Sequence, residues 1–133
     1  MLFAYGQNLE NRGMNEDIRR HLPLNPKILM ILLSVGEGPA HGYEIKKCAE
    51  TQSRGSVRLD AGSLYRSLAQ LVKRELIEEV PADLDTEGDD PRRRYYQISS
   101  LGRTVLRAEL DRLSEIMDVA RSANLLEPAG GSQ

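Results

Sequence analysis

The sequence predicts a mainly α-helical protein that carries one small β-hairpin and ends in a long helix. Apolar residues recur at helical spacing in several short segments that glycine and proline separate. Two short β-patterned runs flank one long polar loop. Toward the C-terminus, apolar residues recur in alternating steps of four and three. We therefore expect an N-terminal extension with a short helix, a helical domain with the hairpin, a C-terminal helix and a disordered tail, at residues 1–24, 25–98, 99–126 and 127–133.

Composition excludes several classes of protein. The 133 residues suit one domain with an appended element, and the 40% that are apolar suffice for a modest core of Leu, Ile and Val. The longest apolar run, Ile28 to Leu33, is far too short to cross a bilayer, and the N-terminus lacks the pattern of a signal peptide. Cys48 is the only cysteine, which excludes an internal disulfide and a cysteine-based zinc site. We expect a cytoplasmic protein with no membrane partner.

The sequence shows no catalytic constellation. The two histidines, His21 and His41, lie apart, and there is no HExxH motif, nucleophile elbow or phosphate-binding glycine loop. We therefore expect no enzymatic activity, no cofactor and no metal site. His41 precedes Gly42 at the start of a helical segment, so we expect it to cap or pack against that helix. Cys48 is expected to be a small core residue.

The first half of the chain predicts a series of short helices. Residues 1–13 show no period, and a short helix is expected from Asn15 to Leu22. Asn25 followed by proline is typical of a helix start, so Lys27 to Val35 should form a mostly buried helix that glycines end. A further helix is expected from Ala40 to Thr51, with its less polar positions at Tyr43, Ile45, Cys48 and Ala49.

The next helix has one apolar side and one polar side. Asp60 is expected to cap it, and it should run from Ala61 to about Arg74. At 100° per residue, the apolar side consists of Leu64, Leu68 and Leu71, with Val72 beside them. Tyr65 lies at the border. The opposite side is formed by small, polar or basic residues: Gly62, Ser63, Arg66, Ser67, Gln70 and Lys73.

That polar side has the properties of a surface that reads DNA. Small side chains near the N-terminal end allow close approach to the major groove, and the free N–H groups there suit a phosphate. Arg66 and Gln70 carry the donors that recognise guanine or adenine edges. The alternative is a solvated surface side without a partner, which most amphipathic helices have.

A β-hairpin with an arginine-rich tip follows this helix. Leu76 to Val80 and Arg94 to Ile98 predict two strands, joined by a strongly acidic loop from Pro81 to Pro91. Arg92, Arg93 and Arg94 would meet the phosphate backbone or the minor groove. Alternatively, these arginines pair with the acidic residues of the loop, which are Asp83, Asp85, Glu87, Asp89 and Asp90.

Charge is segregated along the chain, although the formal net charge is only -2. Basic residues outnumber acidic ones between Ala40 and Glu75. The segment from Leu76 to Asp90 has acidic residues and no basic one, and the segment from Pro91 to Arg103 has the reverse. The local field is therefore more informative about partners than the total charge.

The last helix has a heptad pattern that predicts dimerisation. Ser99 or Ser100 is expected to cap it, and the helical pattern continues from Leu101 to Leu126. Such a helix is roughly 39 Å long, more than this small domain can cover. We therefore expect it to pack against a second copy, although it could also fold back over its own domain. The interface positions would be Leu106, Leu110, Leu113, Met117 and Ala120.

Three motifs follow one another along the chain: HGYEI at 41–45, AGSLYRSLAQLVKRELI at 61–77 and RRYYQISSLG at 93–102. Together they resemble the PadR-like family of transcriptional regulators, and the resemblance covers roughly Ile28 to Leu126. It implies a winged helix-turn-helix domain, a homodimer through the C-terminal helix, and repression by operator binding. It also implies a recognition helix at Gly62–Leu71, a wing at Arg92–Tyr96, and release of DNA by a small phenolic or lipophilic inducer in some members. DNA contacts are expected near Ser63, Tyr65 and Arg66.

Three positions depart from the family pattern. Arg66 stands where the family usually has proline, which adds a candidate base or phosphate contact. Glu75 stands where glycine is common, so we expect a more helical turn into the first wing strand. The chain has no tryptophan, which argues against a pocket that stacks flat drugs.

Our main hypothesis is a dimeric, sequence-specific repressor that binds a palindromic double-stranded operator. The alternative is a winged-helix protein-interaction module without DNA binding, which the net negative charge motivates. An enzyme is the weakest hypothesis, because no catalytic constellation is visible. The residues expected to contact DNA are Ser63, Tyr65, Arg66, Gln70, Lys73, Arg92, Arg93 and Arg94.

Overall fold

The computed structural model describes residues 16–81 and 93–127. Predictions about the first 15 residues, the loop at 82–92 with Arg92 and its acidic residues, and the tail at 128–133 lie outside the described residues. The elements, in chain order, are α2 (Glu16–Arg19), α3 (Pro26–Val35), β1 (Ala40–His41), α4 (Gly42–Gln52), α5 (Ala61–Lys73), β2 (Ile77–Val80), β3 (Tyr95–Ile98) and α6 (Ser100–Ser122).

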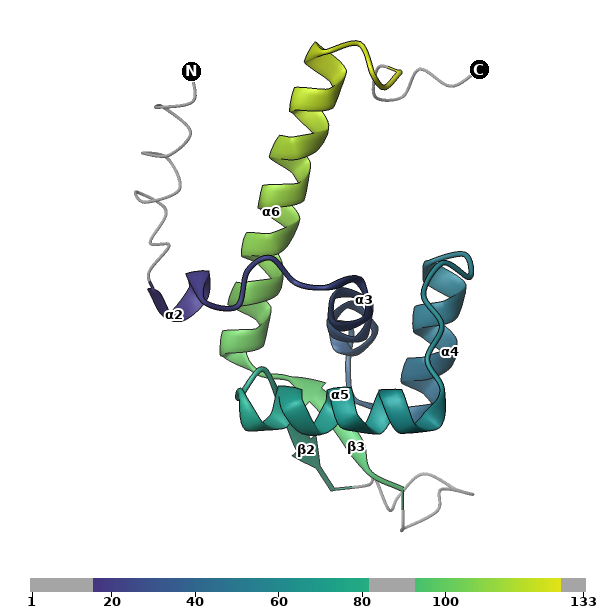
Figure 1. Cartoon of the computed structure of the whole chain (residues 1–133). Coiled ribbons are helices and arrows are strands. Elements are labelled where there is room, and N and C mark those ends of the chain that lie inside the picture. Colours follow the sequence, from purple (N-terminus) through teal and green to yellow (C-terminus); the bar gives the residue numbers. More distant parts are fainter. Residues whose placement is uncertain (1–15, 82–92, 128–133) are drawn as a thin grey trace.

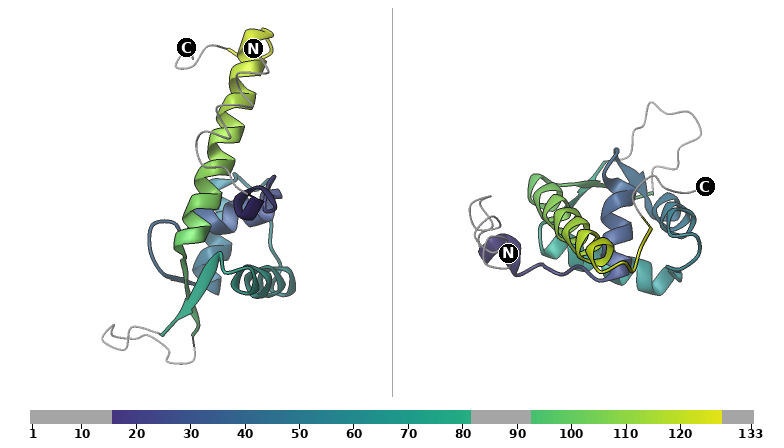
Figure 2. Two further views of the ribbon diagram at one scale, coloured as in Figure 1. Left: turned by 90° about the vertical axis from the view of Figure 1, so that its left-hand side faces the viewer. Right: turned by 90° about the horizontal axis from the view of Figure 1, so that it is seen from above.

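Three helices and a small sheet form the body of the molecule (Figure 1). Helices α3, α4 and α5 pack together, and the three strands form an antiparallel sheet in the order β1-β3-β2. The hairpin β2–β3 projects from one end of this body, and α6 extends away from the other end (Figure 2). This is a winged helix-turn-helix with a long C-terminal helix, which confirms the predicted fold class.

The core is aliphatic, as the composition predicts. The leucines Leu64, Leu68 and Leu71 of α5 are buried, which confirms the apolar side predicted for that helix. Val72 was expected beside them but is exposed. It lies on the flank of α5, at a surface depression that it lines with Ile77 and Leu101. The other large aliphatic side chains that are fully buried are Ile31, Leu32, Val35, Ile45, Leu59, Leu76, Ile77 and Val105.

The helix caps that the sequence predicts are confirmed. The Asn25 side chain accepts a hydrogen bond from the backbone N–H of Ile28 at the start of α3. The Asp60 side chain accepts one from the backbone N–H of Ser63 at the start of α5. Ser99, rather than Ser100, caps α6. His41 caps α4 in a capping box with Glu44, so its predicted role is confirmed.

Strand β1 corrects the expected helix from Ala40 to Thr51. Ala40 pairs with Tyr96 and His41 with Tyr95, and the helix begins only at Gly42. Two residues carry no strand pattern of their own. Their extended conformation depends on a partner strand far along the chain, which no local signal reveals.

Three helices end in the same turn, with a residue other than glycine in the left-handed conformation. Arg54, Glu75 and Asn124 have φ of 55°, 63° and 60° after α4, α5 and α6. After α5, the N–H of Leu76 bonds to the carbonyl of Leu71 and that of Glu75 to Val72, which is the Schellman arrangement. The expected more helical turn at Glu75 is therefore wrong, because its backbone takes the conformation that glycine prefers.

Helix α6 is shorter than expected. It ends at Ser122 rather than Leu126, because Asn124 turns the chain and the N–H of Leu125 bonds back to Ala120. Its 23 residues span roughly 35 Å. Within residues 16–81 and 93–127, no helix has the length and apolarity that a membrane span requires.

Candidate nucleic-acid interface

The outer side of α5 is polar and open to solvent. Gly62, Arg66, Ala69, Gln70 and Lys73 are all exposed along it. No acidic residue occurs in the chain between Asp60 and Glu75, so only the cap at the start of the helix adds negative charge. The side that the sequence predicts to be polar is therefore available to a ligand.

Tyr65 lies on one flank of α5, against the first turn of α4. A Cβ at Gly42 would lie 2.7 Å from the Tyr65 hydroxyl oxygen, so a side chain at position 42 would displace the Tyr65 ring. The ring remains about half exposed. Sequence reasoning did not find this role for Gly42, because α4 and α5 meet only in the folded chain.

Ser63 lies on the opposite flank, against α3. Its hydroxyl oxygen accepts a hydrogen bond of 3.3 Å from the Lys27 ammonium group. Lys27 is exposed and adds a positive charge beside the N-terminal end of α5. The contribution of Lys27 to this surface could not be predicted from the sequence, which shows only a polar residue at the start of a mostly buried helix.

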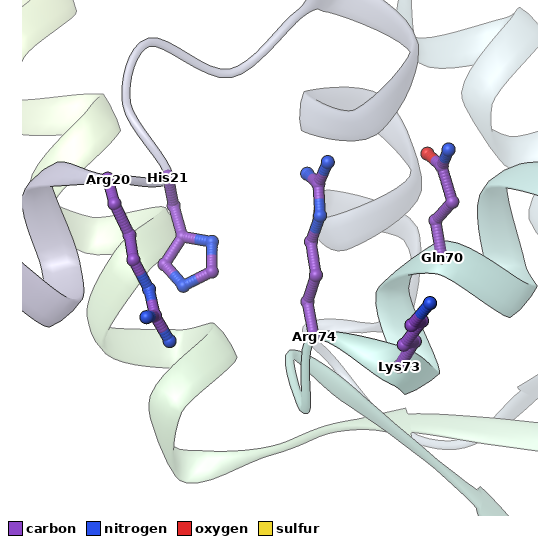
Figure 3. Close-up of a pocket in the computed structure, with 5 residues that line it drawn as sticks. All are labelled: Arg20, His21, Gln70, Lys73 and Arg74. Atoms are coloured by element: carbon purple, nitrogen blue, oxygen red, sulfur yellow. The ribbon is translucent and has the colours of Figure 1, made fainter.

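Arg66 is folded back over the first turn of its own helix. Its Nη1 lies 3.2 Å from the point that a Cβ of Gly62 would occupy, so the guanidinium group covers that glycine. Gln70 and Lys73 lie further along α5, where both line a pocket with Arg20, His21 and Arg74 (Figure 3). The polar side therefore carries one guanidinium group near its start and a cluster of cations near its end.

The wing arginines lie in different surroundings. Arg93 Nη1 lies 3.3 Å from His41 Nε2, next to the capping box of α4. Arg94 Nε lies 3.5 Å from Glu79 Oε1 on the neighbouring strand, in an exposed pair. Exposed ion pairs contribute about 1 kcal/mol or less, so a phosphate could displace this one. Arg92 is outside the described residues.

The predicted interface stripe of α6 divides into a covered and an uncovered part. Leu106 is buried in the domain's own core, so it is not free to meet a second copy. Leu110 and Met117 are exposed, and Leu113 and Ala120 are half-buried. The open part of the stripe therefore begins at Leu110.

Glu109, between these two parts, ties α6 to the chain segment between α2 and α3. Its Oε2 accepts from the Leu24 N–H at 3.0 Å, and Arg112 donates to both carboxylate oxygens at 2.6 and 3.0 Å. The carboxylate is buried. The hydrogen bonds from Arg112 lower the pKa of Glu109 below its usual value. The hydrogen bond from the Leu24 N–H also lowers this pKa, whereas burial of the carboxylate raises it.

Solved structures share this fold. A PadR family transcription regulator from Clostridium difficile R20291 is 22% identical, with a TM-score of 0.62 over 74% of this chain and 97% of that one. A PadR-like transcriptional regulator from Bacillus cereus is 20% identical, with a TM-score of 0.61 over 85% of this chain and all of that one. PadR of Bacillus subtilis, solved in complex with operator DNA, is 18% identical, with a TM-score of 0.56 over 66% of this chain and 47% of that one.

Sequence comparison identifies the family. A curated protein of uncharacterised function from Lysinibacillus sphaericus is 30% identical over 102 residues, which are 77% of this chain and 86% of that protein. The model of the transcriptional regulator PadR-like family matches residues 29–108, from α3 into α6. The chain therefore belongs to the PadR-like family of transcriptional regulators.

Proposed function

We propose that this protein is a dimeric repressor that binds a palindromic operator in the cytoplasm. The observation that carries the proposal is the open polar side of α5, on which Arg66, Gln70 and Lys73 are exposed, in a helix that lies beside the strands of the wing (Figure 1). A helix of this kind fits the major groove, where arginine recognises guanine and glutamine recognises adenine. The operator complex of Bacillus subtilis PadR shows that a protein with this fold binds DNA.

Each predicted contact has a role that its surroundings support. Arg66 and Gln70 would read base edges, and Lys73 would contact a phosphate. Tyr65 and Ser63 would contact the groove walls from the two flanks of α5, supported by Gly42 and Lys27.

The wing would hold the backbone on the other side of the groove. Arg92, Arg93 and Arg94 carry the charge for this contact. Arg94 would exchange Glu79 for a phosphate, which costs little because their ion pair is exposed.

The open part of α6 supports a dimer. Four of the five predicted interface positions remain at least partly accessible, and Ile116 adds a further exposed apolar side chain beside them. Dimerisation through this stripe would cover these side chains and create the two-fold symmetry that a palindromic operator mirrors. A phenolic or lipophilic inducer would act at the interface between the two copies.

The direct test is binding to DNA from immediately upstream of the protein's own coding region. The purified protein is titrated at two salt concentrations against this duplex and an unrelated one. We expect preferential binding to the first that weakens steeply as salt rises, because phosphate contacts release counterions. Absence of binding to both duplexes, with a dimer present in the same buffer, would contradict the proposal and favour a protein-interaction module.

A further inference from the structure

A basic pocket lies where the segment between α2 and α3 meets the C-terminal end of α5. Its volume is about 550 Å³. Figure 3 shows Arg20 and His21 on one side, with Gln70 and Lys73 on the other and Arg74 between them. These five side chains line the pocket, and none of them is apolar.

The lining concentrates positive charge. Arg20, Lys73 and Arg74 bring three cations, and His21 and Gln70 add further hydrogen-bonding groups. Of the residues that the structure describes, those that line this pocket include no carboxylate. Like charges gathered in one concave site repel each other, and an anion bound among them would relieve that repulsion.

His21 lines this pocket with its ring, while its Nε2 is buried behind the pocket surface. The residue is only 9% exposed, and its Nε2 has no hydrogen-bond partner. Burial, Arg20 and Arg74 lower the pKa of His21, whereas Asp17 acts in the opposite direction. The lowered pKa favours the neutral imidazole, so the positive charge of the pocket comes from the two arginines and the lysine.

The two sides of the pocket are held in place before any ligand arrives. On one side, the buried side chains of Ile18 and Leu24 anchor α2 and the segment that follows it in the core. The Glu109 carboxylate also accepts a hydrogen bond from the Leu24 N–H. On the other side, Arg74 is the C-cap of α5, and its backbone N–H bonds to the carbonyl of Gln70. Because the two backbone segments are fixed relative to each other, only the side chains have to become ordered when an anion binds, which limits the entropy cost.

We propose that this pocket binds a phosphate group, held by the cationic side chains of Arg20, Arg74 and Lys73. Gln70 and Lys73 belong both to this pocket and to the outer side of α5. Two sources of the phosphate fit this chemistry. One is a backbone phosphate of a DNA duplex that lies along α5. The other is a free phosphate-bearing molecule that would link the N-terminal segment to α5. The inference goes beyond the proposed function, and its first test needs no DNA.

The first test is a titration of the DNA-free full-length protein with inorganic phosphate. Sodium chloride keeps the ionic strength constant, and NMR follows the side-chain signals of His21 and Gln70. Wild type is compared with Arg20→Gln and Arg74→Gln. The matched control is Arg107→Gln, which removes the same charge from an exposed position on α6 that does not line the pocket.

We expect saturable shifts in wild type and in the control. The affinity should fall about tenfold or more in each pocket variant, because each loses a charge-assisted hydrogen bond. Shifts that do not saturate, or equal affinity in all four proteins, would overturn the proposal.

The second test distinguishes the two sources by DNA binding. If the phosphate belongs to DNA, Arg20→Gln weakens binding to every duplex relative to Arg107→Gln and lowers the salt slope by about one unit. If it belongs to a free molecule, the two variants bind DNA equally and only inorganic phosphate distinguishes them. A protein that binds phosphate in the pocket but no DNA would contradict the proposed function and leave this inference standing.

Discussion

Helices α5 and α6 are both amphipathic, but the domain covers their apolar sides to different extents. Leu64, Leu68 and Leu71 of α5 are at most 2% exposed, so the domain satisfies that side completely. On α6 the domain covers Leu106, whereas Leu110 and Met117 are exposed by 41% and 42%. This difference in coverage indicates that the two helices face different partners. Helix α5 can offer only its polar side, which suits DNA, and α6 offers an apolar stripe, which suits a second copy.

The largest effect on stability is expected on the apolar side of α5, which the domain covers completely. Leu68→Ala should lower the free energy of unfolding by about 2–5 kcal/mol, because it leaves a cavity in the core. Leu125→Ala, at a position 76% exposed, should change it by less than about 0.5 kcal/mol. Urea denaturation measures both. Equal losses would show that the contrast between covered and uncovered positions is wrong.

A charge in the open stripe of α6 tests its assignment as the interface. Met117→Asp should weaken dimerisation by on the order of 3 kcal/mol, because an unpaired charge would be buried between the copies. Val119→Asp is the matched control, since Val119 is exposed on the same helix but outside the stripe. Sedimentation equilibrium measures the dimer. Dissociation by Val119→Asp alone would move the interface to another side of α6.

Glu109 tests the boundary between the covered and uncovered parts of α6. Its lowered pKa means that its contribution to stability is fully present above its ordinary pKa of 4.5 and is lost as pH falls through the lower folded pKa. Glu109→Gln should cost about 1–3 kcal/mol at pH 7 and make the acid dependence of stability shallower. Denaturation at a series of pH values checks this, with Asp111→Asn as an exposed control. An unchanged pH profile in Glu109→Gln would contradict the role of this carboxylate.

The smallest effect is expected at the end of α5. Glu75→Gly should raise the free energy of unfolding by about 1 kcal/mol or less, because glycine adopts φ of 63° without steric cost. Glu78→Gly, in strand β2, should lower it instead. Thermal denaturation compares the two variants. A loss of stability in Glu75→Gly would mean that the Glu75 side chain makes a contribution larger than the backbone strain.

Features with local signals could be predicted from the sequence. Asn25 before proline, Asp60 before a small residue and the leucine spacing of α5 specify where helices begin and which side they bury. These signals depend on neighbours within one or two helical turns, so the sequence contains them directly.

Features that depend on distant contacts could not be predicted. Strand β1 forms only because β3 lies beside it, and the buried carboxylate of Glu109 accepts a hydrogen bond from Leu24, 85 residues earlier. The basic pocket has the same origin. Arg20 and Arg74 belong to unrelated segments, and the fold brings them to one site.

The central claim is that the outer side of α5 reads bases, and a double-mutant cycle on Arg66 tests it most directly. Fluorescence anisotropy would measure wild type, Arg66→Ala and the control Arg107→Ala on the operator and on each single base-pair substitution. We expect Arg66→Ala to cost about 1–3 kcal/mol on the operator and to remove discrimination at one base pair, while Arg107→Ala keeps it. Equal discrimination at every position in wild type and Arg66→Ala would contradict the claim that Arg66 reads a base.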